Sequence, residues 1–350
     1  GYRNLSTKSK IVALLDENFK QVNTLSTNKT GWVMLDKTPF YATSGGQNGD
    51  IGTLTNGENI TIIKETKKFF GMNISLAHVT SGTLILSEKT EALVRSRIEV
   101  SKHHSATHLL QSALRMVLGD SVSQAGSFND DKRLRFDFTY PKAMSTRQIE
   151  EVQDLVNSMI AQSLAGSVEE LPIEEAKTKG AIAMFGEKYG DTVRVVEFGE
   201  VSVEFCGGTH VRNTAEIGSF YITKESGVSA GVRRIEAVAG LAAITYVQDA
   251  MQKLSLVEAE LKNKDIVEGI TKLKKQIKEL KNELKDAHEN TATPLEELEI
   301  NGVKVIVAII ENVDIKKIID DMKNAHDKIA ILLLQAKGDK VMLVSGVKNT

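Results

Sequence analysis

Histidine is concentrated in one short segment of the chain, KHHSATHLLQSALRMVLGD at residues 102–120, which holds three of the seven histidines. His104 and His108 are four positions apart, within a stretch whose apolar residues recur at helical spacing from Val100 to Leu118. Residues four apart lie one above the other on a helix, so the two imidazoles can reach a common point. This spacing is compatible with a metal site, and it also occurs among histidines that only pack.

The pair does not fit the zinc-protease pattern. That pattern places Glu directly after the first histidine, where it serves as the general base. Ser105 occupies this position. The sequence therefore excludes this class of hydrolase.

A second pair of metal-binding residue types occurs in CGGTH at residues 206–210, which contains the single cysteine of the chain. Two glycines allow a tight backbone path, so Cys206 and His210 can turn back onto one ion. Zinc (Zn2+) accepts such mixed sulfur and nitrogen ligands in tetrahedral geometry. The two pairs together predict a zinc site formed by His104, His108, Cys206 and His210. Four protein ligands are typical of structural zinc, whereas catalytic zinc keeps one position open, and the sequence leaves both roles open.

Composition and charge are those of an ordinary globular protein. The chain has 350 residues, of which 41% are hydrophobic and 26% charged, and its formal net charge is −2. This charge indicates no global field for nucleic acid, so an RNA partner would need local patches. One cysteine excludes an intrachain disulfide, and no apolar run is long enough to span a membrane. We expect a cytoplasmic protein. The start at Gly1 and the end soon after a predicted strand indicate part of a longer protein.

The alternating patterns predict an α+β fold. Residues 1–95 form a β-rich part with strands near 31–38, 59–66 and 73–80 and the Gly-rich loop FYATSGGQNGDIG at 40–52. Residues 96–240 form a two-layer α/β core with a second helix near 145–164, capped by Ser145 or Thr146, and strands near 133–140, 192–198, 201–205, 217–224 and 232–238. Residues 241–290 contain two helical patterns, and Asp265 with Glu268 offers a capping box at their break. We expect an antiparallel helical hairpin there, followed at 298–350 by a partial α/β domain of β-α-β-β order.

Four segments together resemble the editing domain of the alanyl-tRNA synthetase family, which free-standing editing proteins share. These are LDKTPFYATSGGQNGDIG, HHSATHLLQSAL, CGGTHV and GVSAGVRRIEAVAG, in this order over about two hundred residues. The resemblance implies the editing fold of the alanyl- and threonyl-tRNA synthetases. It also implies zinc-dependent hydrolysis of tRNA(Ala) mischarged with serine or glycine. The ATP-dependent aminoacylation domain is not expected in this chain, and the C-terminal part resembles a domain that dimerises in the intact enzymes.

The resemblance also implies roles for several polar residues near the zinc site. Thr43 corresponds to a position linked to recognition of the serine hydroxyl, Gln47 could hold a water or the terminal ribose, and Gln124 is a further pocket residue. His103 stands where Asn is expected in the family, and we expect it to be exposed to solvent.

Three basic residues are candidates for contact with tRNA. Lys102 lies beside the ligand pair, and Arg233 and Arg234 are adjacent, so that on a strand they point to opposite faces. We expect at most one of the two arginines to face RNA and the other to pair with an acidic neighbour.

Two rival functions remain at this point. A free-standing editing protein would perform the same chemistry. A tRNA-binding or dimerisation module with structural zinc would bind tRNA without hydrolysing the ester.

Overall fold

A computed structural model describes residues 4–183, 189–289, 296–310, 314–337 and 340–349. The chain forms two compact units, Gly1–Met251 and Gln252–Thr350. The expected β-rich N-terminal part and mixed α+β class are confirmed.

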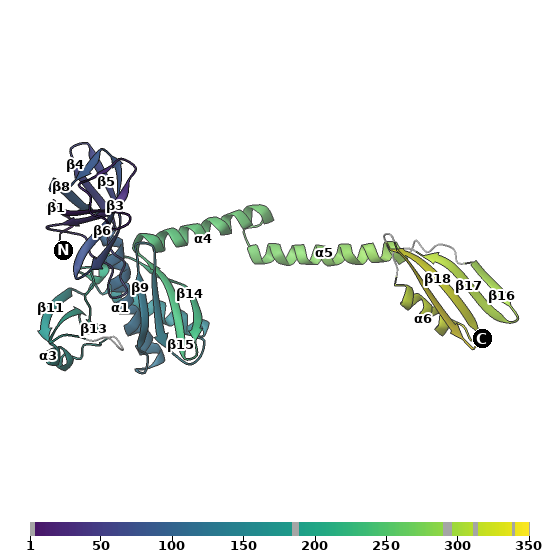
Figure 1. Cartoon of the computed structure of the whole chain (residues 1–350). Coiled ribbons are helices and arrows are strands. Elements are labelled where there is room, and N and C mark those ends of the chain that lie inside the picture. The colour runs from purple at the N-terminus through teal and green to yellow at the C-terminus, as the bar shows by residue number, and fades with distance from the viewer. Residues whose placement is uncertain (1–3, 184–188, 290–295, 311–313, 338–339, 350) are drawn as a thin grey trace. The chain divides into compact units, whose positions relative to one another are not determined.

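A closed barrel occupies the N-terminal part of the first unit (Figure 1). Its strands follow the order β1-β3-β6-β5-β4-β8, and a short β2-β7 pair lies outside this ring. Alternation explains the strands, since every second residue of β8 is buried. The bounds are β1 (Ser6–Asp16), β2 (Thr24–Ser26), β3 (Thr30–Leu35), β4 (Gly52–Asn56), β5 (Asn59–Phe69), β6 (Met72–Ser81), β7 (Thr83–Ile85) and β8 (Lys89–Val94). The predicted strands correspond to β3, β5 and β6, whereas β1, β4 and β8 were not predicted.

The barrel leads directly into a layer of helices packed on an antiparallel sheet. Helices α1 (Arg97–Leu118) and α2 (Thr146–Ala161) cover the sheet β14-β15-β10-β9. Its strands are β9 (Gln124–Asn129), β10 (Leu134–Thr139), β14 (Phe220–Ser229) and β15 (Val232–Ala239). The core between the layers includes Leu110, Phe136 and Ile235, all fully buried. The capping role predicted for Ser145 is confirmed, because it forms a capping box with Gln148 at the start of α2.

A small sheet completes the first unit and carries the second ligand pair. It has the order β11-β12-β13, with β11 (Gly166–Pro172), β12 (Thr192–Phe198) and β13 (Ser202–Phe205). A short helix α3 (Ile173–Thr178) and a 3-10 turn η1 (Thr214–Ile217) accompany it. Cys206 follows directly after β13, so the end of this strand sets the position of the CGGTH segment.

Two long helices follow, α4 (Gly240–Leu261) and α5 (Ile266–Glu289). The predicted cap at Asp265 is present, since its carboxylate accepts the backbone N–H of Glu268 at 2.9 Å. The apolar side chains of α5 at Leu273, Ile277 and Leu280 are exposed. The antiparallel hairpin of these helices stays a prediction.

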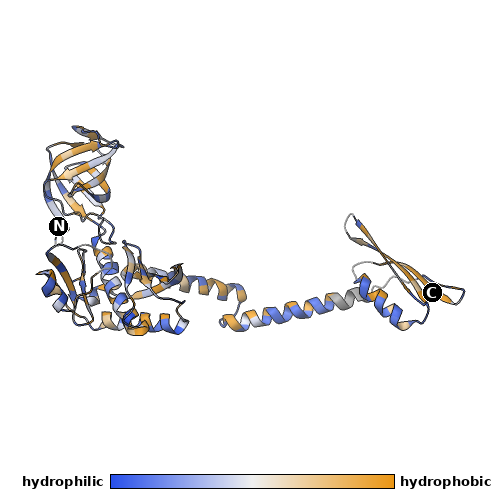
Figure 2. Ribbon diagram, turned by 60° about the horizontal axis from the view of Figure 1, so that its bottom comes forward, coloured by the Kyte–Doolittle hydropathy of each residue, from blue (hydrophilic) through white to orange (hydrophobic). Residues whose placement is uncertain are grey.

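The second unit contains a four-stranded sheet of order β16-β17-β18-β19. Its elements are β16 (Glu296–Ile300), β17 (Val303–Ile310), α6 (Ile315–Ala325), β18 (Ile329–Lys337) and β19 (Lys340–Lys348). Strands β17 and β18 pair in parallel, and α6 connects them and packs on the sheet. Strands β17 and β18 are largely hydrophobic, and α6 carries residues of both kinds (Figure 2). The predicted β-α-β-β elements are present, and β16 was not predicted. Within the described part of the chain, none of the helices has the length and hydropathy needed to cross a bilayer.

Candidate metal centre

Helix α1 presents His104 and His108 on its buried side. The side chains of these residues are almost completely buried, at 4% and 3% exposure. The start of the helix is anchored by Arg97, whose Nε donates to both carboxylate oxygens of Asp50 and whose Nη2 donates to the Pro39 carbonyl oxygen. This buried ion pair ties α1 to the segment that carries the Gly-rich loop.

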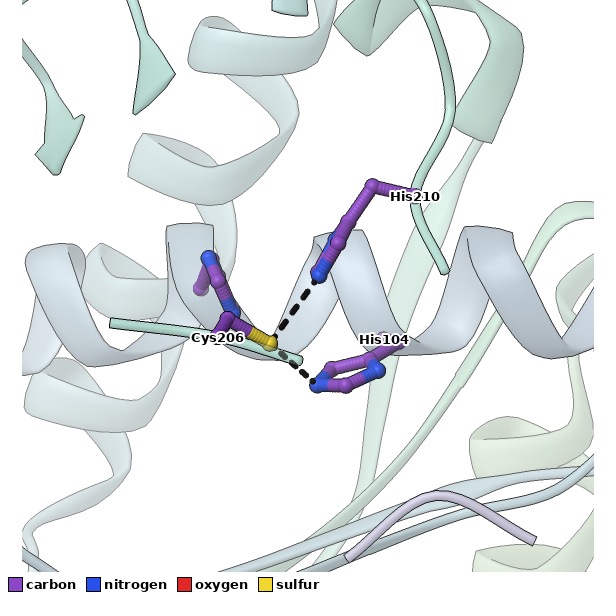
Figure 3. Close-up of side chains that lie close together, drawn as sticks. His104, Cys206 and His210 are labelled. Carbon is purple, nitrogen blue, oxygen red and sulfur yellow. Dashed lines mark hydrogen bonds between the residues drawn. The ribbon is translucent and has the colours of Figure 1, made fainter. Parts of the chain in front are cut away.

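The CGGTH segment brings Cys206 and His210 to the same point. Cys206 Sγ lies 3.4 Å from His104 Nε2 and 3.2 Å from His210 Nε2 (Figure 3). With His108 included, one ligand atom of each of the four residues lies within 4.8 Å of the others. The structure therefore brings together all four predicted ligands.

The path of the CGGTH segment is fixed from two sides. Arg194 Nη1 donates to the carbonyl oxygens of Cys206, at 2.6 Å, and Gly208, at 2.8 Å. On the other side the backbone passes close to His104, because a Cβ added at Gly208 would fall within 3.0 Å of the His104 ring and 2.9 Å from Gln47 Oε1. A glycine at position 208 is therefore required by space. This is a more specific reason than the flexibility that the sequence suggested.

Gln47 fixes the orientation of the His104 ring. Its Oε1 accepts the backbone N–H of Thr209 at 2.8 Å and lies 2.8 Å from His104 Nδ1. Because an amide oxygen can only accept, Nδ1 carries the proton and the lone pair of Nε2 faces Cys206. Gln47 Nε2 donates to Thr209 Oγ1 at 2.9 Å, and Ser101 Oγ is 2.8 Å from the same hydroxyl. The fully buried Gln47 thus holds a candidate metal ligand in place.

Ser105 contacts the His210 ring from the side opposite the Cys206 sulfur. Its hydroxyl oxygen lies 3.1 Å from His210 Nδ1 and accepts the backbone N–H of Val211 at 3.1 Å. This contact leaves Nε2 of His210 facing the Cys206 sulfur. The sequence reasoning missed Ser105, Thr209 and Arg194 as positioning residues. Ser105 and Thr209 lie inside the two ligand motifs, and this position in the sequence could have indicated that they contact the ligands.

His108 has a nitrogen that the protein leaves unsatisfied. Its Nδ1 is buried and has no hydrogen-bond partner among the residues that the structure describes. Its Nε2 lies 3.6 Å from Glu204 Oε2, beyond hydrogen-bond range. A buried polar atom without a partner is costly, and no described protein group offsets this cost.

Burial keeps the site histidines neutral. It lowers the pKa of His104 to about 3, with a smaller effect from Arg194, and lowers the pKa of His108 and of His210 well below the usual range. Burial likewise raises the pKa of Glu204 to about 8. Neutral imidazole is the form that binds metal. One sulfur and three imidazole nitrogens form a donor set that zinc accepts.

The two other pocket candidates lie around the Gly-rich loop. Thr43 is exposed, and its hydroxyl donates to the Thr66 carbonyl oxygen at 3.3 Å and accepts the Gly49 N–H at 2.9 Å. Gln124 Nε2 donates to Ser127 Oγ at 3.0 Å, on the strand against which the loop packs. Both side chains already have partners within the protein, so their contact with substrate stays a prediction.

The three basic candidates are all in ion pairs. Lys102 pairs with Glu99 at 2.8 Å. Arg233 donates to both carboxylate oxygens of Glu225, and Arg234 donates to both of Asp137, at 2.6 to 2.8 Å. The sequence predicted a carboxylate partner for one of the two arginines, and the structure provides one for each. Contact of these residues with tRNA stays a prediction.

The expected exposure of His103 is wrong. Its side chain is fully buried, its Nε2 accepts the Ala239 N–H at 3.1 Å, and its Nδ1 lies 3.1 Å from the Glu99 carbonyl oxygen. The ring joins α1 to the end of β15, and its pKa is lowered by burial. The helix turns this residue toward the sheet, which its neighbours in sequence did not indicate.

The sequence of the chain is similar to two known domain families and to several known proteins. The family model described as "Threonyl and Alanyl tRNA synthetase second additional domain" matches residues 193–236, and "tRNA synthetases class II (A)" matches residues 1–98. Proteins named alanine–tRNA ligase are similar over the whole chain. Those of Aliarcobacter butzleri, Sulfurovum sp. and Campylobacter jejuni (strain RM1221) are 66%, 52% and 50% identical. The chain spans 41%, 41% and 40% of their respective lengths. Because its sequence is similar to these proteins over its whole length, the chain belongs to the alanyl-tRNA synthetase family.

Proposed function

We propose that the chain hydrolyses the ester of tRNA(Ala) mischarged with serine or glycine, with zinc bound at His104, His108, Cys206 and His210. The observation that carries the proposal is the convergence of the four ligand atoms within 4.8 Å, with the unsatisfied His108 Nδ1 among the buried groups. The names of the relatives and the synthetase domain model at 193–236 support tRNA as the partner.

A second hydrolytic site has a physical rationale in this family. A pocket that accepts alanine cannot exclude the smaller glycine by size. Rejection of serine by one added hydroxyl is also weak, because pocket contacts of this size discriminate by only about 1–3 kcal/mol. Hydrolysis of the wrong ester supplies the remaining discrimination.

In the proposed reaction, water attacks the ester carbonyl and the bond to the 3′ oxygen of the terminal adenosine breaks. The products are the free amino acid and tRNA with its 3′ hydroxyl restored. Zinc, when bound, would supply Lewis-acid chemistry at this site. Gln47 holds the His104 ring in the tautomer that leaves Nε2 free to bind metal, and Ser105 holds the His210 ring by a contact to its Nδ1. In the same proposal Thr43 and Gln124 contact the aminoacyl end of the substrate.

The test is release of amino acid from seryl-tRNA(Ala), with alanyl-tRNA(Ala) as the control substrate. We expect the zinc-loaded chain to release serine and spare alanine, and Cys206→Ser to lose zinc and serine release together. His326→Ala, a histidine outside the cluster, is the matched control and should retain both. If Cys206→Ser kept full zinc and full hydrolysis, the site would be wrongly assigned.

Four protein ligands also favour one alternative, because structural zinc sites are closed in this way. In that case the chain would bind tRNA tightly and hydrolyse neither ester. The cytoplasmic location and a dimer through the C-terminal part belong to the main proposal. Sedimentation of the chain would test the dimer.

A further inference from the structure

Four aromatic side chains, three exposed and one half-buried, form a cluster on the barrel that the proposed hydrolysis does not use. Phe19 stacks on Trp32 at a ring-centroid distance of 5.4 Å and on Phe69 at 5.6 Å, with interplanar angles of 17° and 16°. Phe70 meets Phe69 edge-on at 4.6 Å. We call Phe19, Trp32, Phe69 and Phe70 the aromatic cluster. Phe70 is 87% exposed, in a chain with only 5% aromatic residues.

Two of the four aromatic residues, Phe19 and Phe70, lie in turns whose backbone conformation disfavours phenylalanine. Phe70 and Gly71 form the two-residue turn between the paired residues Phe69 and Met72, with φ of 48° and 80°. Positive φ at both positions is the pattern of a type I′ turn, in which Asn-Gly is preferred. Phe19 also has a positive φ, of 60°, at the end of the turn after β1. A bulky residue is strained there, so folding alone does not account for phenylalanine at either position.

Basic side chains accompany the rings. Lys67 Nζ lies 5.9 Å from the centroid of the Trp32 ring, and it also pairs with Glu65 at 3.0 Å. Lys20 directly follows Phe19, Lys68 directly precedes Phe69, and both lysines are exposed. Interleaved aromatic and basic side chains are typical of surfaces that bind single-stranded nucleic acid, because rings stack on bases while lysines meet phosphates.

We propose that the aromatic cluster is a stacking platform for unpaired bases of an RNA strand. The open ring of Phe70 offers a surface for a base, and the lysines favour an anion over an apolar protein segment. Recognition by stacking suits single-stranded regions, because their bases are unpaired and can leave the base stack. Only the choice of RNA rather than DNA rests on the proposed function.

The single tryptophan of the chain provides a direct readout, since Trp32 belongs to the cluster. We would titrate the chain with a fluorescein-labelled oligouridylate of about 12 nucleotides, within the usual site size. Anisotropy gives the affinity, and Trp32 emission reports stacking. Phe70→Asn and Phe19→Asn place a residue that tolerates positive φ in each turn, so thermal unfolding should not shift to lower temperature.

We expect RNA to quench Trp32 and each substitution to weaken binding about 5- to 150-fold, the range for loss of one base-stacking contact. Lys67→Gln should lower the slope of log affinity against log salt by about 1. Tyr221→Thr, which removes a 41% exposed ring outside the cluster, is the matched control and should bind normally.

The proposal is overturned if the double variant, which carries both Phe19→Asn and Phe70→Asn, binds RNA like the wild type. It is also overturned if the substitutions abolish self-association without affecting RNA, since the cluster would then contact a second copy. Cys206→Ser should leave this RNA affinity unchanged. A failure of the platform is therefore distinguishable from a failure of the proposed hydrolysis.

Discussion

Replacing Gly208 by alanine tests the geometry of the metal centre most directly. The added Cβ would fall within 3.0 Å of the His104 ring and 2.9 Å from Gln47 Oε1. We expect the ring to retreat by about 1 Å, several times the tolerance of about 0.2 Å on a metal–ligand distance. The move would also break the hydrogen bond from His104 Nδ1 to Gln47. Loss of such an outer contact alone weakens metal binding about 10- to 100-fold. With the ligand displaced as well, we expect zinc affinity to fall at least about 100-fold, or about 2.8 kcal/mol.

The neighbouring glycine provides a matched control. A Cβ at Gly207 would meet no described atom within 4 Å, and its φ is not positive. We expect Gly207→Ala to bind zinc like the wild type. The assay is competition for zinc with a chromophoric chelator, together with thermal unfolding of the metal-free proteins to show that both variants fold. Equal zinc affinity of Gly208→Ala and Gly207→Ala would refute the inferred role of Gly208.

Three further predictions concern the surroundings of the centre. Ser105→Ala removes the partner of His210 Nδ1, and we expect zinc affinity to fall about 10- to 100-fold in the same competition assay. Asp50→Asn leaves the Arg97 guanidinium buried without its carboxylate, so urea unfolding should show a loss of about 3–5 kcal/mol, and a loss below 1 kcal/mol would contradict this. The third concerns acid: because the site histidines have lowered pKa values, the unfolded chain binds more protons than the folded chain below pH 6.5. The metal-free protein should therefore lose stability as pH falls from 6.5, by up to about 4 kcal/mol per unit for three groups, partly offset by Glu204 with its raised pKa. A free energy of unfolding that stays constant between pH 6 and pH 5 would refute this.

The convergence of the four candidate ligands could be predicted from the sequence because each pair is local. A spacing of four residues on a helix and a Gly-Gly turn both determine where two side chains meet. The partners of these ligands could not be predicted in the same way. Gln47 reaches His104 because the Gly-rich loop packs on β9, where the Asn48 N–H donates to the Asn129 carbonyl oxygen at 2.9 Å. Contacts between segments this far apart leave no periodic signal.

The same limit applies to the fold. Strands β3, β5 and β6 alternate or run apolar and could be predicted. Strand β4, GTLTN, is short and polar in sequence, and it is a strand because β5 and β8 pair with it on either side to close the barrel. His103 was misjudged for a related reason. Its ring is buried by β15, whose position relative to α1 depends on the whole core.

The hydrogen bond between Gln47 and His104 joins two parts of the first unit that are far apart in the sequence, the Gly-rich loop and helix α1. This bond makes metal binding and docking of the Gly-rich loop mutually dependent. The docked loop orients His104 through Gln47, and a metal bound at His104 would in turn hold the ring where Gln47 bonds to it. Thermodynamic linkage requires this dependence to be reciprocal. Removal of metal should therefore loosen the loop, and a ligand that holds the loop in place should tighten metal binding by the same factor. Amide hydrogen exchange at Gly49 and Asn48, measured with and without zinc, would give the size of this coupling.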